Sequence, residues 1–425
     1  MANRLVAFRG TDEEACLKQS LKRPISADHS SPAGFFNLII KWSNALLGTA
    51  FNDAWVSLKL TEDRLRRNYN EYGKAECGLV KFNSLLNVSI LETFIRFGVD
   101  NIEKIDLDGR HAFLCILEFL RERRNHENAI KTISGKESDK SQVITVLANH
   151  LFSQLVPGKV YEVDDKIGPG PIMCGCGCKA EICKGNTALG SCGTWHGRVD
   201  IYLNSKIPVV VQTQYMTSQD VEEDDSGDDE HNDEHIMKQR RKENENFDEN
   251  EEDPILKNGE SCDYSAEVKY EYDRNEDTVL MCQTGLQRVL VQAITNGFAQ
   301  VNRNEISLSQ FFIPTFGATS NHVTICLYEP ENDILLHIEK QLKLWMDSPN
   351  GTSELKVDTI VIIWLFLNFT IFTPNCLHSL MEFKTSGMHK DLGQNLDLYK
   401  TTTTKVDYEI PLIPVFDDVD PAVLS

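Results

Sequence analysis

Apolar side chains recur with helical spacing in the first third of the chain. Between Phe113 and Leu120 they fall at i, i+1, i+4 and i+7, and cationic side chains follow in the last turn, where they suit the helix dipole. A second stripe at i+4 spacing runs from Val143 to Leu155 and ends before Pro157. Both patterns predict amphipathic helices that turn one apolar face toward a core.

The period of the pattern changes beyond Gly158. Apolar and polar residues alternate over 199–203, and 207–211 is a run rich in β-branched side chains, so the residues between them predict a hairpin turn. The order of the elements predicts an α+β or mixed α/β fold, in which a mixed domain follows a helical N-terminal region. Further strands are expected at 266–270, 311–313 and 323–327, and a further helix at 285–301.

The length of the chain sets its expected division into domains. Its 425 residues are enough for two or three domains at about 150 residues each, and 41% of them are hydrophobic, which supplies a sizeable core. The first residues are polar and are broken by Pro24 and Pro32, which predicts a mobile arm. We expect a mobile N-terminal arm at 1–34, a helical domain at 35–140, the mixed core at 141–345, and a C-terminal helix and tail that pack on the core at 346–425.

Neither an export signal nor a membrane span is expected. The first residues are charged and polar where a secretory signal needs an apolar stretch. The run from Ile360 to Phe372 is interrupted by Asn368 and is shorter than the roughly 20 apolar residues of a spanning helix. The sequence therefore predicts an intracellular protein, in the cytoplasm or nucleus, with no membrane partner. It also predicts that this apolar run is a buried core element.

Negative charge is concentrated in one segment. The chain has 64 acidic and 43 basic residues, a net charge of −21, and the segment from Asp220 to Asp253 alone has 17 acidic and 4 basic residues. Because so polar a segment buries little apolar surface, we expect a disordered acidic insert at 217–262. The segment 220–253 would attract a basic protein partner, whereas nucleic acid could bind only through a local site.

Five of the 12 cysteines lie in one short segment, and a histidine follows it. Four thiolate or imidazole groups that converge form a tetrahedral zinc site, so structural zinc is one interpretation of the segment. The C-x-C-x-C spacing is tighter than in the usual zinc knuckle. A glycine-rich loop without metal and a disulfide or reactive thiol are therefore alternatives. The candidate ligands are Cys174, Cys176, Cys178, Cys183 and Cys192, with His196 as a candidate partner.

A carboxylate in the predicted strand at 199–203 is a second candidate metal ligand. Asp200 has apolar neighbours, among which a charge needs a solvated cleft or a cation. The alternative to a metal ligand is a structural Asp whose charge is satisfied in an ion-pair network. Glu267 and Lys269 fall on one face of the strand predicted at 266–270, because side chains alternate along a strand. Carboxylate oxygens suit Mg²⁺, and a neighbouring lysine can position or help to deprotonate a water molecule.

The order of these residues resembles that of the PD-(D/E)XK nuclease-like superfamily, in which a strand with Asp, a strand with E-x-K and a helix with glutamine follow one another. The resemblance covers about 143–336. It implies a core with a central mixed sheet flanked by helices, and a metal-dependent cleavage of nucleic-acid phosphodiesters. Asp200 and Glu267 would then hold Mg²⁺, Lys269 would assist the attacking water, and Gln287 would help to orient the site.

Two features of the sequence leave an alternative open. The helix in the family's first position carries His150 and Gln154, where the family commonly has Glu. The strand directly after the predicted hairpin has Gln212 and Gln214 at the spacing of E-x-K, and neutral amides bind a divalent cation poorly. In this second alignment the chain is an inactive nuclease fold. The alternative function is a non-enzymatic interaction protein that binds a basic partner through 220–253.

Overall fold

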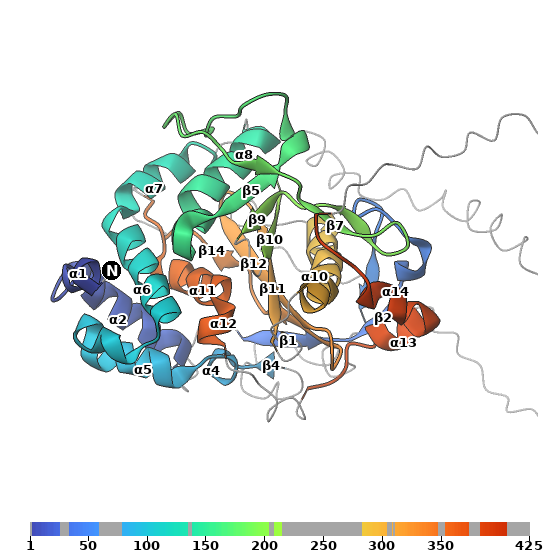
Figure 1. The fold of residues 1–425 in the computed structure, drawn as a ribbon, viewed down its shortest axis with the longest axis horizontal. Coiled ribbons are helices and arrows are strands. Elements are labelled where there is room, and N and C mark those ends of the chain that lie inside the picture. The colour runs from blue at the N-terminus through green and yellow to red at the C-terminus, as the bar shows by residue number, and fades with distance from the viewer. Residues whose placement is uncertain are drawn as a thin grey trace, which may run out of the picture. The chain divides into compact units, whose positions relative to one another are not determined.

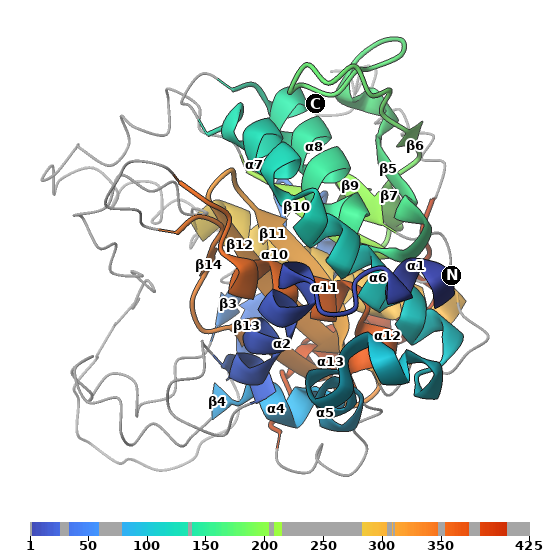
Figure 2. The same ribbon diagram turned by 90° about the vertical axis from the view of Figure 1, so that its left-hand side faces the viewer.

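The structure is a computed structural model, and it describes residues 2–25, 34–58, 79–134, 138–203, 208–214, 283–303, 308, 311–346, 353–373 and 383–405. These residues belong to one compact unit, which spans 1–215 and 279–425. The predicted fold class is confirmed, because a large mixed sheet has helices packed against it (Figures 1 and 2). The strand predicted at 266–270 and the insert predicted at 217–262 lie outside the described residues.

One mixed sheet organises the described part of the chain. Its strands are β1 (Phe35–Leu38), β4 (Leu79–Val80), β5 (Tyr161–Asp164), β6 (Lys184–Gly185), β9 (Ile201–Leu203), β10 (Val209–Thr213), β11 (Ile313–Ala318), β12 (His322–Glu329), β13 (Ile334–Ile338) and β14 (Leu342–Lys343). Their order is β4-β1-β13-β12-β11-β10-β9-β5-β6, and β14 pairs with β12. β10 and β11 run parallel, and the helix α10 (Gln283–Arg303) lies between them in the chain, as a parallel crossover requires. β9 and β10 are antiparallel, which confirms the predicted hairpin strands.

The two faces of the sheet carry two separate cores. On β12, Val323, Ile325 and Leu327 belong to the first core, whereas Cys326 and Tyr328 belong to the second, as expected of side chains that alternate along a strand. The helix α10 packs on the second face and the other long helices on the first (Figure 1). The helices on the first face include α2 (Asp12–Ile25), α4 (Phe82–Leu85), α5 (Val88–Phe97), α6 (Leu107–Arg121), α8 (Lys140–Leu147), α11 (Val357–Leu367) and α12 (Phe369–Phe372).

The C-terminal residues complete the second core. Trp195 is fully buried, and its ring meets that of Tyr399 edge to face at a centroid distance of 6.0 Å. The Tyr399 hydroxyl accepts a hydrogen bond from the Trp195 backbone N–H (3.0 Å) and donates one to the Ala45 carbonyl (3.1 Å). Part of the predicted tail is thus built into the core. The small elements here are β2 (Ile40–Ser43), η1 (Ala45–Leu47), β3 (Val56–Leu58), β7 (Ala188–Gly190), β8 (His196–Arg198), α13 (Met388–Leu392) and α14 (Leu396–Lys400).

The prediction of a mobile N-terminal arm is wrong for residues 2–25. These residues form α1 (Ala2–Val6) and α2, and Leu17 and Leu21, one turn apart, are fully buried against the helices of the first face. The helix ends at Ile25, one residue after Pro24, which removes one backbone hydrogen bond from the last turn. Residues 26–33 lie outside the described part of the chain.

The region predicted as a helical domain is not separate from the core. β1 enters the main sheet, where Phe35 pairs with Ile338. Its helices pack on the first face of that same sheet. Local helical periodicity could not reveal this arrangement, because the partner strand lies near the other end of the chain.

The apolar run beginning at Ile360 forms α11 and α12, which confirms the prediction of a buried core element. Residues 360–367 are all buried, and the Trp364 indole N–H donates to the Ala112 carbonyl at 2.9 Å. Among the described residues, none of the helices combines the length and the apolar character that crossing a membrane requires.

Candidate functional site

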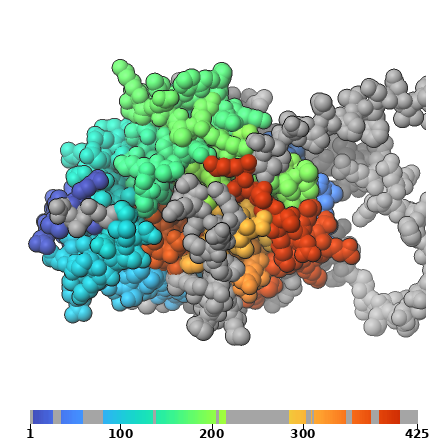
Figure 3. All heavy atoms as spheres, viewed as in Figure 1, coloured from blue at the N-terminus to red at the C-terminus, as the bar shows by residue number. Residues whose placement is uncertain are grey.

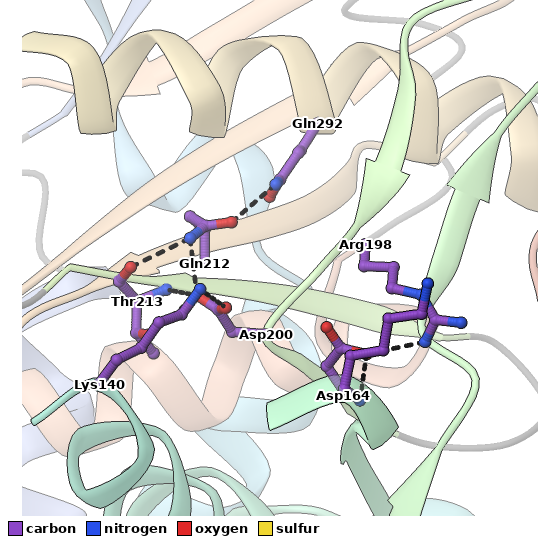
Figure 4. Close-up of polar contacts among 8 residues, drawn as sticks. Lys140, Asp164, Arg198, Asp200, Gln212, Thr213 and Gln292 are labelled. Atoms are coloured by element: carbon purple, nitrogen blue, oxygen red, sulfur yellow. Dashed lines mark hydrogen bonds and ion pairs between the residues drawn. The ribbon is translucent and has the colours of Figure 1, made fainter. Parts of the chain in front are cut away.

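Asp200 lies in a bend directly before β9, rather than within a strand as predicted, and only 5% of its surface is exposed. Its partners come from α8 and β10. The Oδ2 atom accepts hydrogen bonds from Gln212 Nε2 (2.6 Å), from the Thr213 backbone N–H (2.7 Å) and from Thr213 Oγ1 (2.9 Å). The Oδ1 atom lies 3.1 Å from the Nζ atom of Lys140, which is the first residue of α8 (Figure 4). Each carboxylate oxygen thus has at least one partner from the protein.

Gln212 links this carboxylate to the helix on the second face. Its Nε2 also donates to the Thr213 carbonyl at 3.0 Å, and its Oε1 accepts from Gln292 Nε2 on α10 at 2.8 Å (Figure 4). Lys140, Asp200, Gln212, Thr213 and Gln292 are called the Asp200 centre below. It contains one carboxylate, one cation and neutral polar groups.

The Asp200 centre does not fit Mg²⁺. A magnesium ion takes oxygen ligands in near-octahedral geometry, and protein sites supply one or two carboxylates that can face it. Here the Lys140 ammonium and the donors of Gln212 and Thr213 occupy the positions around Asp200. Among the described residues, the only group of three or more histidine, cysteine or acidic side chains that could hold a metal ion lies elsewhere.

The structure does not place the other predicted site residues beside Asp200. Glu267 and Lys269 lie outside the described residues. Gln287 is half-buried on α10, and it is Gln292, five residues later, that reaches Gln212. Five residues correspond to about 140° around a helix, so the two side chains point in different directions. No pattern in the sequence pointed to Lys140, because only the fold brings the start of α8 beside β10.

A second arrangement joins three of the predicted cysteines to one histidine. One ligand atom from each of His150, Cys174, Cys176 and Cys178 lies within 4.8 Å of all the others. His150 Nε2 is 3.1 Å from Cys176 Sγ and 3.4 Å from Cys178 Sγ, and Cys174 Sγ is 3.4 Å from Cys176 Sγ. These four residues, called the His150–cysteine group, could hold a metal ion such as zinc.

Local backbone geometry explains why the three cysteines converge. Gly177 N–H donates to the Cys174 carbonyl at 3.2 Å, which closes a tight turn, and Gly177 has a φ of +84°, in the left-handed region that favours glycine. Gly175 packs directly on α8, where an added Cβ atom would lie 2.9 Å from the Gln142 Cα atom. The alternating glycines therefore let the turn fold tightly and rest on the helix. On the face shown in Figure 3, this segment (green) lies at the surface beside the helices coloured teal.

His150 comes from an irregular part of the helix predicted at 143–155. α8 ends at Leu147 and continues as a π-helical turn, η3 (Ala148–Phe152), and then as a short 3-10 turn, η4 (Ser153–Leu155). Single π-helical turns within helices are frequent at functional sites. In the sequence, His150 stands out only as a departure from the nuclease family, because no ligand-spacing rule connects it with cysteines 24 or more residues away.

Burial changes the acid–base properties of the group. It raises the pKa of the Cys174 thiol to about 12 and also raises the pKa of Cys176. Burial opposes ionisation of Cys178 as well, but hydrogen bonds from the Ala180 backbone N–H and the neighbouring thiols outweigh it and lower the pKa of Cys178. Burial lowers the pKa of His150, which favours the neutral imidazole that a metal ion requires.

The other predicted ligands do not belong to this group. Cys183 and Cys192 are exposed free cysteines outside it. His196 Nδ1 lies 2.9 Å from the Thr194 carbonyl, so His150 and not His196 is the imidazole beside the thiols. All five cysteines of the segment are free, which excludes the disulfide alternative in this structure.

The chain was compared with models of protein families, with curated proteins and with solved structures. None of the three comparisons gives a significant match.

Proposed function

We propose that the chain is a PD-(D/E)XK-like protein whose core binds its target without cleaving it. The observation that carries the proposal is the contact between Gln212 and Asp200, in which an amide takes the place of a second metal-binding carboxylate. The order of the elements supports it: α8, the bend with Asp200, strand β10 with Gln212, and the glutamine-bearing helix α10 follow in the sequence expected of the family.

The chemistry of the Asp200 centre supports binding rather than turnover. Cleavage in this family would need a divalent cation to stabilise negative charge and a base to activate water. Gln212 and Gln214 are neutral, and among the described residues the cation beside Asp200 is Lys140, which already forms an ion pair with it. The proposed centre therefore holds the sheet and two helices together.

The proposed partner is a basic protein surface that contacts the acidic segment 220–253. That segment carries 17 of the 64 acidic residues and only 4 basic ones, so its field attracts cations. It belongs to the connection between β10 and α10, directly beyond the strand that carries Gln212. The proposed partner-binding segment thus follows closely in the sequence on a strand of the proposed inactive core.

The proposed cofactor is one structural zinc ion held by the His150–cysteine group, and no magnesium ion is proposed. Three thiolates and one imidazole complete a tetrahedral coordination and leave no open position, which is the pattern of a structural site. Zinc bonds of about 2.3 Å to sulfur and about 2.0 Å to nitrogen keep the ligand atoms roughly 3.5–3.8 Å apart. Three of the distances between ligand atoms are 3.1 to 3.4 Å, and all four atoms lie within 4.8 Å of one another. Small movements of the side chains would therefore bring these atoms to the distances that zinc requires.

The experiment that tests the inactive core is a cleavage assay on the full chain. Single- and double-stranded DNA and RNA are incubated with the protein and Mg²⁺ or Mn²⁺, and no cleavage is expected. A double substitution, Gln212→Glu with Gln214→Lys, rebuilds E-x-K beside Asp200 and is expected to introduce Mn²⁺ binding measurable by calorimetry. Far-ultraviolet circular dichroism of both proteins controls for folding.

The assay also tests the active alternative, in which Glu267 and Lys269 supply the missing groups. Cleavage by the unmodified chain that disappears in Asp200→Ala and in Lys269→Ala would overturn the inactive-core proposal. In that case the second strand with E-x-K would be the functional one. Cleavage that survives both substitutions would point to a contaminating nuclease.

A further inference from the structure

The second ring nitrogen of His150 faces another histidine. His126 Nδ1 lies 3.4 Å from His150 Nδ1, on the side of the imidazole opposite to the thiols. His126 belongs to α7 (Arg123–Lys131), and 8% of its surface is exposed. We infer that His126 is the positioning residue of the zinc centre, an inference that rests on the zinc ion of the proposed function.

The direction of the hydrogen bond between the two rings decides whether His150 can bind a metal. A neutral imidazole carries one N–H and one lone pair. If His150 Nδ1 donates to His126 Nδ1, the lone pair of His150 is on Nε2, which points at Cys176 and Cys178. The opposite direction would place the proton of His150 on Nε2 and exclude it as a ligand. An acceptor at position 126 therefore selects the metal-binding form.

The surroundings of His126 hold its ring in place. The ring stacks on Phe119 with a centroid distance of 4.8 Å and an angle of 9° between the planes. It also lines a cavity of 260 Å³ whose other walls include Gln154 and Lys159, so polar groups are near the side chain. A ring fixed by stacking keeps its acceptor aimed at His150, as outer partners of metal-bound histidines commonly do.

Two substitutions separate the hydrogen bond from simple packing. His126→Phe keeps an aromatic ring that can stack on Phe119 but has no acceptor. His126→Asn loses the stacking but can place its Oδ1 atom near the position of Nδ1. If His126 orients the ligand, the phenylalanine variant binds zinc about 10- to 100-fold more weakly, and the asparagine variant recovers part of that loss.

The experiment measures zinc affinity by competition with a chromophoric chelator, using the full chain. Cobalt replaces zinc in a parallel series, because its visible absorption reports tetrahedral thiolate coordination. Cys176→Ser is expected to abolish stoichiometric binding, whereas Cys183→Ser, which changes an exposed cysteine outside the group, is expected to keep one zinc per chain. Circular dichroism of the metal-free proteins shows whether each variant folds.

The outcomes distinguish the two proposals. If the unmodified, folded chain binds no zinc, both the zinc ion and the role of His126 are wrong. If it binds one zinc ion and His126→Phe has the same affinity and cobalt spectrum, only the role of His126 is wrong. Weaker binding by both variants, with no recovery in His126→Asn, would also overturn the positioning role and leave packing as the explanation.

Discussion

The carboxylate of Asp200 is stabilised by protein groups rather than by solvent. Three donors from Gln212 and Thr213 reach one of its oxygens, and Lys140 reaches the other. Buried polar groups of this kind contribute little net free energy while they are paired, but a donor left without an acceptor is costly. The side chain is therefore expected to matter for stability.

We expect Asp200→Ala to lower the free energy of unfolding by roughly 1–3 kcal/mol, because the Gln212 and Thr213 donors lose their acceptor. Urea denaturation at neutral pH measures this change. Asp164→Ala is a useful comparison, since its carboxylate pairs with Arg198 in a more exposed position, at 20% side-chain exposure. Unchanged or increased stability of Asp200→Ala would contradict the structural role and suit a strained metal ligand instead.

The surroundings of the Glu14 carboxylate are expected to make the stability of the fold depend on pH. Burial alone would raise its pKa, but hydrogen bonds from the Gly10 N–H, the Lys18 ammonium and the Val99 N–H outweigh burial and lower the pKa below the ordinary value of 4.5. A group with a lowered folded-state pKa stabilises the fold above its unfolded-state pKa. This contribution is lost as the pH falls through the folded-state value.

The variant Glu14→Gln removes the charge and should cost about 1–3 kcal/mol at pH 7, where the carboxylate is ionised. The difference between the variant and the unmodified chain should shrink at pH 3. Denaturation curves at the two pH values test this. A difference that stays constant would show that shape, and not charge, makes Glu14 stabilising.

At the scale of elements, sequence patterns predicted what local contacts determine. α6 and α10 follow apolar stripes, and α11 follows a continuous apolar run. β9 follows alternation, and β10 follows a run of β-branched side chains. α2 was missed, because its stripe is short and Pro24 resembled a helix breaker in a polar context. The partners Lys140 and His150 were missed for a different reason: their roles depend on distances across the fold that no spacing in the sequence encodes.

The packing of α2 on the core leads to a prediction that differs from the one expected for a mobile arm. Leu17 is fully buried on this helix, so Leu17→Ala should lower the free energy of unfolding by roughly 2–5 kcal/mol through the cavity it leaves. Lys22→Ala changes an exposed residue of the same helix and should stay within about 0.5 kcal/mol. Equal effects of the two substitutions in thermal or urea unfolding would show that α2 is not docked on the core.

At the scale of the whole molecule, the acidic segment should be separable from the fold. The described residues belong to one unit that excludes residues 216–278. Deleting 220–253 is therefore expected to leave the melting temperature of the protein nearly unchanged. The same deletion should abolish retention on a cation-bearing partner such as a polylysine resin, whereas deletion of 406–425, at the C-terminal end, serves as a control for chain shortening. Retention after the first deletion would show that the segment is not the binding element.

The overall strand order was beyond sequence patterns. The class of the fold followed from helical periodicity in the N-terminal third of the chain and from alternation beyond Gly158. β1, however, was not recognised as a strand of the main sheet. Its four residues, Phe35–Leu38, are too short a run to distinguish a buried strand from a loop. Pairing with β13 is decided by the completed core, since both strands contribute to the same two apolar clusters.

The pairing of Phe35 with Ile338 has a consequence for synthesis on the ribosome. β13 follows β1 by about 300 residues, and at about 5–20 residues per second it leaves the ribosome roughly 15–60 s later. Until then the helices of the N-terminal third have no completed sheet on which to pack their apolar faces. Nascent chains therefore expose these surfaces for most of translation, and we expect chaperones that recognise apolar segments to hold them until the last strands emerge.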